Sequence, residues 1–143
     1  MADAELTLGW VIVYVDEPTA AVAFYERAFG MRGEFAAPDG SYAQIDSGPT
    51  KLAFAAYALG DGNFDGGVQR APLDGRPPNV ELALVAEDVD GAYARALEAG
   101  CESLHAPQDK PQGHRTARSW SSRRRCSPGA PWRGRKVVLS NRG

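Results

Sequence analysis

A chain of 143 residues, 43% of them hydrophobic, can bury one core, shared by a single domain or by two small halves. No apolar run approaches the ~20 residues of a membrane helix, and the first ten residues lack the basic start of a secretory signal. Two cysteines, Cys101 and Cys126, fit a reducing cytoplasm better than a disulfide scaffold. We therefore expect a cytoplasmic protein without a membrane contact.

The net charge of −2 hides a division of the chain. Residues 1–109 hold all 18 acidic residues and 6 of the 16 basic ones, which gives −12. Residues 110–143 hold the other 10 basic residues and no acid, which gives +10. The C-terminal segment therefore needs an account of its own.

The first structured unit runs from residue 10 to residue 57. Alternation predicts a strand at its start, with one face formed by Val11, Val13 and Val15 and the other by Trp10, Ile12 and Tyr14. Thr19–Phe29 carries the apolar stripe of a helix, and Gly30 ends it. Three short strands follow, at 32–37, 42–46 and 51–57. We expect the valine face to pack against the helix.

A second unit repeats this pattern roughly 70 residues later. It has a strand at 79–86, a helix at Asp88–Ala99, a stopping Gly100 and strands at 101–105 and 114–117; Trp10 falls opposite Glu81 in this register. The sequence thus predicts an α+β fold of two βαβββ modules, at 1–57 and 79–117. Residues 58–78 hold five glycines and three prolines and are predicted to be an inter-module loop.

Residues 118–143 differ in composition from the rest. They are rich in Arg, Ser, Pro and Gly, and only Lys136–Ser140 has the pattern of a strand. Three interpretations stay open: a disordered basic tail, a patch for an anionic partner around Arg123–Arg125, or a shifted reading frame. We expect residues 118–134 to lie outside the sheet, which would leave the second module incomplete.

The segments FYERAFG, at the end of the first helix, and LALVAEDVDGAYARALEAG, in the second unit, carry a family resemblance. They resemble the glyoxalase / bleomycin resistance protein / extradiol dioxygenase family, the vicinal oxygen chelate superfamily. The resemblance covers about residues 7–117. It implies a cup-shaped sheet built from two βαβββ modules, a small-molecule ligand in the cup, and a homodimer.

The metal enzymes of this family hold a divalent ion with side chains from the first and last strands of the modules. By this resemblance the first-strand positions are Trp10 and Glu81, and the last strand of the first module offers only Ala53 and Ala55. A divalent cation needs three or four converging N or O ligands. We therefore expect no cofactor; a divalent metal held by Glu81, the only candidate ligand, is the alternative.

The strand register predicts the wall of the cup. Its six residues are Trp10, Ile12, Tyr14, Glu81, Ala83 and Val85. Glu81 has two interpretations, a water-facing residue at a sheet edge or a polar group in the pocket. His105 and His114 lack a partner at ligand spacing, so we expect surface or loop roles for both.

These observations favour a protein that binds an apolar or aromatic small molecule in the cup without metal catalysis. One alternative is a metal-dependent lyase or dioxygenase that uses Glu81. The other is a protein that binds an anionic partner through its Arg-rich tail, although we do not expect nucleic acid to be the partner.

Overall fold

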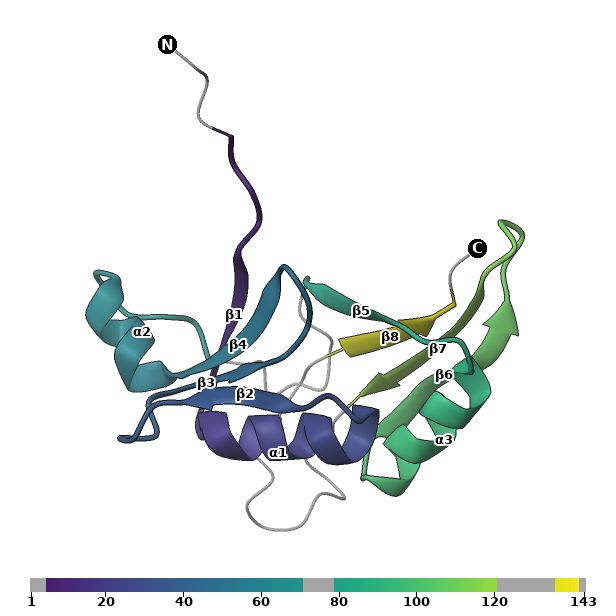
Figure 1. Ribbon diagram of the computed structural model, residues 1–143, viewed down its shortest axis with the longest axis horizontal. Coiled ribbons are helices and arrows are strands. Elements are labelled where there is room, and N and C mark those ends of the chain that lie inside the picture. The colour runs from purple at the N-terminus through teal and green to yellow at the C-terminus, as the bar shows by residue number, and fades with distance from the viewer. Residues whose placement is uncertain (1–4, 71–78, 121–135, 142–143) are drawn as a thin grey trace.

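The protein consists of two four-stranded sheets, each carrying one long helix on one of its faces (Figure 1). The computed structural model describes residues 5–70, 79–120 and 136–141. Both long helices lie on the same side of the molecule, and the opposite side of the two sheets is open (Figure 1).

The first module has the predicted βαβββ order. Its elements are β1 (Trp10–Val15), α1 (Pro18–Phe29), β2 (Gly33–Ala36), β3 (Tyr42–Ile45) and β4 (Lys51–Ala56). The sheet has the order β1-β4-β3-β2, in which β1 and β4 run parallel and the other pairs are antiparallel. The strand β1 therefore forms one edge of this sheet.

The ends of α1 follow from its terminal residues. Pro18 occupies the first turn, where the missing N–H costs no helical hydrogen bond. Gly30 ends the helix in the left-handed region, at φ 66°, and its N–H donates to Glu26 O at 3.0 Å. The predicted helix Thr19–Phe29 is confirmed to within one residue.

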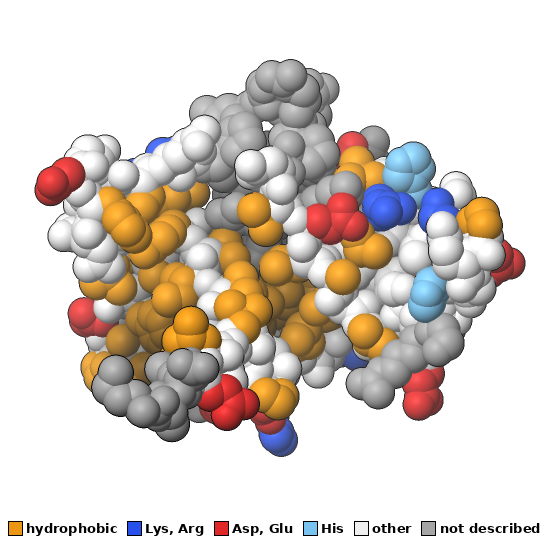
Figure 2. Space-filling view, turned by 90° about the horizontal axis from the view of Figure 1, so that it is seen from above, with side chains coloured by type: hydrophobic (Ala, Val, Ile, Leu, Met, Phe, Trp, Pro, Cys, Tyr) orange, Lys and Arg blue, Asp and Glu red, His pale blue; other side chains and the backbone are white. Residues whose placement is uncertain are grey.

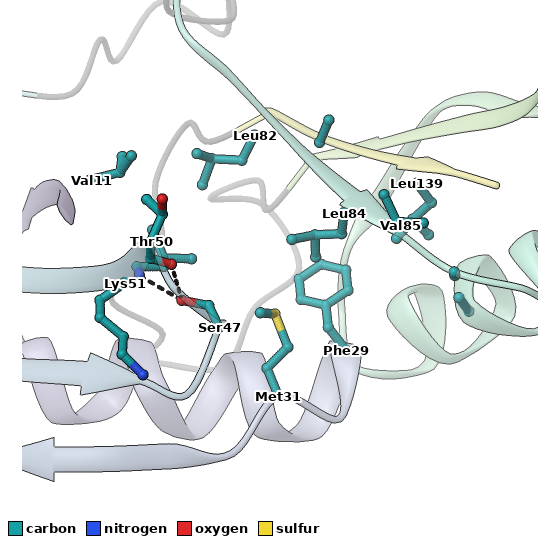
Figure 3. Close-up of a pocket in the computed structure, with 14 residues that line it drawn as sticks. Val11, Phe29, Met31, Ser47, Thr50, Lys51, Leu82, Leu84, Val85 and Leu139 are labelled. Atoms are coloured by element: carbon teal, nitrogen blue, oxygen red, sulfur yellow. Dashed lines mark hydrogen bonds between the residues drawn. The ribbon is translucent and has the colours of Figure 1, made fainter. Parts of the chain in front are cut away.

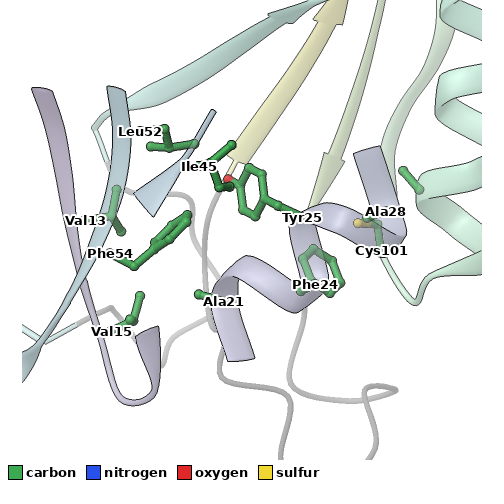
Figure 4. Packing of buried hydrophobic residues seen from close by; sticks show 11 residues of the cluster. Val13, Val15, Ala21, Phe24, Tyr25, Ala28, Ile45, Leu52, Phe54 and Cys101 are labelled. Atoms are coloured by element: carbon green, nitrogen blue, oxygen red, sulfur yellow. The ribbon is translucent and has the colours of Figure 1, made fainter. Parts of the chain in front are cut away.

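The main core fills the space between α1 and the valine face of β1 (Figure 4). Tyr25 and Phe54 are its largest buried side chains, with ring centroids 5.3 Å apart. Ala96 and Cys101 of the second module belong to the same cluster. The two modules thus share one core. Its other buried members are Val13, Val15, Ala21, Phe24, Ala28, Ile45 and Leu52.

The second module repeats the topology of the first. Its elements are β5 (Glu81–Val85), α3 (Val89–Glu98), β6 (Glu102–Asp109), β7 (Arg115–Trp120) and β8 (Lys136–Ser140), in the sheet order β5-β8-β7-β6. Asp88 caps α3 by accepting from the Gly91 N–H at 2.9 Å. The α+β fold of two βαβββ modules is therefore confirmed.

The second sheet corrects the expectation of an incomplete module. Arg118–Trp120 continue β7, and β8 lies between β5 and β7, so this sheet has four strands like the first. The strand at Lys136–Ser140 was predicted, and its β-branched and leucine residues pair in register with β5. Arg123–Arg125 and Cys126 lie outside the described residues, so the three interpretations of residues 118–143 stay open for that part.

A short helix, α2 (Tyr57–Asn63), begins directly after β4, where the sequence predicted a loop from residue 58. Its glycines disfavour a helix on propensity alone, and tertiary packing overrides that preference. Gly60 is buried against the ring of Tyr14, which a Cβ at this position would approach to 2.6 Å. Among the described residues, no helix has the length and apolar composition needed to cross a membrane.

Arg95 links the two modules. From α3 its Nε donates to Arg27 O at 3.0 Å and its Nη2 donates to Glu26 O at 3.1 Å. These carbonyl groups belong to the last turn of α1, where a helix lacks internal donors and favours a cation. Gly30 leaves the space in which Nη1 lies, since a Cβ there would be 2.9 Å from it. The C-terminus of α1 is therefore held against α3.

Candidate functional site

A pocket of about 460 Å³ lies at the seam between the modules (Figure 3). We call it the seam pocket, and eleven of its fourteen lining residues are apolar. They are Val11, Phe29, Met31, Leu52, Leu82, Ala83, Leu84, Val85, Ala86, Ala92 and Leu139, with Ser47, Thr50 and Lys51 as the polar members. Volume and composition are those of a small-molecule site, since such sites typically span about 300–1,000 Å³ and are mostly apolar.

The end of α1 forms one wall of the seam pocket. The left-handed Gly30 reverses the chain there, and the Met31 N–H donates to Tyr25 O at 3.3 Å. Phe29, the last residue of α1, extends toward Leu84, and Met31, just after the turn, lies beside Phe29 (Figure 3). The turn that ends the helix therefore also positions two of the pocket's largest side chains.

The opposite wall belongs to the second module. Leu82 and Leu84 of β5 point to the face of the second sheet that the helices cover. There Leu84 packs against a smaller core of Val89, Ala117 and Leu139. Ala92 adds a small side chain from α3. Because Leu82 and Leu84 are only half-buried, this core leaves part of their surface open to the pocket.

The polar lining groups are engaged within the protein. Ser47 Oγ accepts from the Leu52 N–H at 2.8 Å and donates to Thr50 O at 2.9 Å, and Thr50 Oγ1 donates to Leu8 O at 2.7 Å. Lys51 Nζ lies 2.9 Å from Glu34 Oε1, and Figure 3 shows it directed away from the pocket. This contact raises the pKa of Lys51 and lowers that of Glu34, so both stay charged near neutral pH.

The first-module residues of the predicted wall lie on the open face of the first sheet, opposite α1. Trp10 and Ile12 are 58% and 47% exposed, whereas Val13 and Val15 are buried on the helix side. Tyr14 lies beneath Gly60 of α2. The faces are those that alternation predicts, and the role of these residues as a pocket wall stays a prediction.

A hydrogen-bond network crosses this open face. Trp10 Nε1 donates to Gln44 Oε1 at 3.1 Å, and Tyr42 Oη donates to the same atom at 2.9 Å. Gln44 Nε2 in turn donates to Glu34 Oε2 at 2.6 Å, which joins the network to Lys51. Figure 2 shows this side of the molecule, where hydrophobic side chains gather over the first sheet and along the middle and both histidines lie over the second.

Glu81, Ala83 and Val85 lie on the open face of the second sheet, but only Ala83 and Val85 line the seam pocket. Glu81 Oε1 is 3.8 Å from Arg118 Nη2, and its side chain is 36% exposed. These observations favour the interpretation of Glu81 as a water-facing residue at the sheet edge over that of a polar group in the pocket. His105 is exposed on β6, and His114 lies in the turn before β7.

The residues at the family's ligand positions do not fit a divalent cation. Trp10 and Glu81 are indeed the first residues of β1 and β5, but an indole N–H only donates, and Trp10 uses it on Gln44. Ala53 and Ala55 of β4 supply no donor atom and are buried. Among residues 5–70, 79–120 and 136–141, no three His, Cys, Asp or Glu side chains come close enough to hold a metal ion.

Sequence reasoning missed most of the seam pocket. It assigned Val11 to the helix side of its strand, and the alternation that placed Ala83 and Val85 on the cup wall leaves Leu82 and Leu84 on the helix side as well. It did not indicate that this surface remains partly open. Phe29 was placed on the apolar stripe of the helix, and Met31 was not singled out. The missing signal was the packing of the two modules, which leaves these side chains incompletely covered.

Comparison with known proteins identifies the family. Residues 7–119 match the family model of the Glyoxalase/Bleomycin resistance protein/Dioxygenase superfamily. Proteins named "Putative glyoxylase CFP32" from Mycobacterium bovis and Mycobacterium tuberculosis are 30% identical over 111 residues, 78% of this chain. The chain spans 38% of the length of these relatives.

Solved structures agree in fold. A glyoxalase/bleomycin resistance protein/dioxygenase family enzyme from Burkholderia phytofirmans PsJN superposes with a TM-score of 0.70 at 16% identity, covering 95% of this chain and 98% of that one. A lactoylglutathione lyase from Agrobacterium tumefaciens gives 0.62 at 17% identity, covering 94% and 92%. At such identities the likeness concerns the fold, while the family match rests on the sequence. The chain belongs to the glyoxalase/bleomycin resistance protein/dioxygenase superfamily.

Proposed function

We propose that this protein binds an uncharged apolar small molecule in the seam pocket and does not catalyse a metal-dependent reaction. The observation that carries the proposal is a pocket of about 460 Å³ whose apolar lining comes from both modules. Burying apolar ligand surface there would contribute about 25 cal/mol per Å². Lys51 is the one charged residue among the described lining residues, and its ammonium group contacts Glu34 and points away from the pocket. The predicted wall on the open face is the rival location for the same ligand.

The metal-dependent alternative has no support from the described residues. Its single candidate ligand, Glu81, lies beside the guanidinium of Arg118, and the remaining family positions carry an indole and two alanines. After dialysis, elemental analysis should find less than one equivalent of Zn, Fe, Mn or Ni. A tightly held equivalent that disappears in Glu81→Ala would instead revive the lyase or dioxygenase interpretation.

A homodimer and a cytoplasmic location belong to the same proposal. Trp10, Ile12 and Phe35 leave large apolar surfaces exposed on the open side of the first sheet. Contiguous exposed apolar patches commonly mark interaction sites. The anionic-partner alternative depends on Arg123–Arg125, which lie outside the described residues.

The proposal is tested with N-phenyl-1-naphthylamine, an uncharged apolar fluorophore whose emission rises in apolar surroundings. We expect saturable binding that Ala92→Phe weakens at least about tenfold, or about 1.4 kcal/mol, because the ring occupies part of the pocket. The matched control is Ala94→Phe, an exposed position on the same helix that does not line the pocket. Circular dichroism melts establish that both variants fold.

Equal binding by the two variants would contradict the proposed location. If Ala92→Phe fails to fold, Met31→Glu replaces it, because a carboxylate at the pocket wall should exclude the apolar probe. Its control is Leu59→Glu, on the exposed side of α2.

A further inference from the structure

The seam pocket follows the edge of β5 rather than one of its faces. Five consecutive residues of this strand region, 82 to 86, line it. Successive side chains of a strand point to opposite faces, so Leu82 and Leu84 point to the helices while Ala83 and Val85 point to the open side. A pocket that touches all of them must run along the strand's side.

Among residues 5–70, 79–120 and 136–141, that side has no strand partner. The strand β5 is the last of its sheet, and its other edge is occupied by β8. The Ala86 N–H donates to Ser140 O at 2.9 Å, and peptide groups alternate in direction along a strand. The backbone groups of residues 82, 84 and 86 therefore point to β8, and those of Ala83 and Val85 point to the pocket.

Backbone N–H and C=O groups beside an apolar pocket need partners. Ala83 and Val85 are two residues apart, so their peptide groups lie about 7 Å from each other along the strand. This is the spacing at which an extended peptide presents its own hydrogen-bonding groups, as in the addition of a strand to a sheet edge. A ligand with secondary amides at that spacing would pair with the edge.

The pocket also limits the ligand's charge and shape. Its hydroxyl and ammonium groups are engaged within the protein, so the described residues that line it offer no unpaired ion to a charged ligand. A second hollow, lined by Val85, Ala86, Glu87 and Asn141, adjoins the C-terminal end of β5 and shares two residues with the seam pocket. An elongated ligand could thus extend along the strand.

Resting on the proposed function above, we infer that the ligand of the seam pocket is an uncharged, elongated apolar molecule with secondary amide groups that pair with the free edge of β5 at Ala83 and Val85. A capped apolar dipeptide is the simplest molecule of this class. The pocket's volume suits such a small molecule rather than a folded partner.

The test measures displacement of N-phenyl-1-naphthylamine by N-acetyl-leucyl-valine N-methylamide and by its ester analogue, in which oxygen replaces the central N–H. The amide should bind about tenfold more tightly than the ester, because one hydrogen bond is lost and one acceptor is left unpaired. The variant Val85→Pro removes the edge N–H of residue 85, and proline is tolerated at the edge of a sheet. In this variant the ratio of ester to amide dissociation constants should fall toward one. In the control Val80→Pro, at an exposed position outside the pocket, the ratio should persist.

Equal binding of amide and ester, with the fluorophore still bound, would overturn the inference and leave the proposed function intact. If the wild-type protein does not bind the fluorophore, both the inference and the proposed function are overturned. If Val85→Pro fails to fold, amide hydrogen exchange on the wild type decides: the dipeptide should slow exchange at Ala83 and Val85 more than at Leu84. If sedimentation shows that Val85→Pro dissociates a dimer, the edge pairs with a second copy and the inference is wrong.

Discussion

The two modules share one topology and differ in how much they bury. In the first, α1 buries Phe24 and Tyr25 among five residues, and four consecutive residues of β4 are buried. In the second, α3 buries only Val89 and Ala96, and β6 is exposed along almost its whole length. The shared topology therefore follows from the alternating pattern. The size of the core depends on the volume of the buried side chains, and the larger buried side chains belong to the first module.

The comparison predicts unequal costs of core truncation. Phe54→Ala should lower the free energy of unfolding by about 3–5 kcal/mol, because a fully buried ring leaves a cavity between α1 and β4. Val89→Ala, in the smaller core, removes two methyl groups and should cost about 2 kcal/mol. Urea denaturation measures both. Equal losses would show that the two cores contribute alike.

A second prediction concerns the bond between the modules. Arg95→Met should cost about 1–2 kcal/mol, since Arg27 O and Glu26 O lose the guanidinium that donates to them and the end of α1 loses a favourable cation, although Glu26 O keeps the Gly30 N–H. The control, Arg32→Met, removes an exposed guanidinium that is 3.6 Å from Asp46 and should change the free energy by less than about 0.5 kcal/mol. Thermal melts compare the two, and similar losses would remove Arg95 from its linking role.

The smallest predicted effect is a pH dependence carried by one ion pair on each half. Hydrogen bonds from Arg70 lower the pKa of Asp61, and those from Arg115 lower that of Asp90. A carboxyl whose pKa is lower in the folded state stabilises the fold above its unfolded pKa, near ~3.9, and this contribution is lost as the pH falls through the folded value. Both pairs are exposed, so each contribution is small.

Asp61→Asn and Asp90→Asn should therefore each flatten the decline of the melting temperature between about pH 4 and pH 2. Their melting temperatures should approach that of the wild type at the acid end. A decline as steep as that of the wild type in both variants would mean that other carboxyl groups carry the acid sensitivity.

Alternation predicted much of the fold because it reports directly which face a residue occupies. It placed Val13 and Val15 inside, Trp10 and Ile12 outside, and the strand at 136–140. It did not predict α2, because the glycines of this segment have low helix propensity and the packing of Gly60 against Tyr14, which favours the helix, is a tertiary contact.

The seam pocket was beyond the reach of periodicity for a different reason. A pattern assigns Leu82 or Leu84 to a face but does not say whether the opposing module covers that face completely. That outcome depends on the packing of α1 against α3 and on the contact of Arg95, which have no local sequence period. The candidate site therefore depends on how the two modules pack together.

The central claim is that the apolar ligand enters the seam pocket rather than the open face of the first sheet. Met31 lines the pocket, and Ile12 lies on the open face, so their methyl groups report separately on the two places. In a methyl NMR titration with N-phenyl-1-naphthylamine, we predict that the Met31 resonance shifts with saturation while the Ile12 resonance stays in place. A saturable shift of Ile12 with an unchanged Met31 would contradict the account and assign binding to the wall of Trp10, Ile12 and Tyr14.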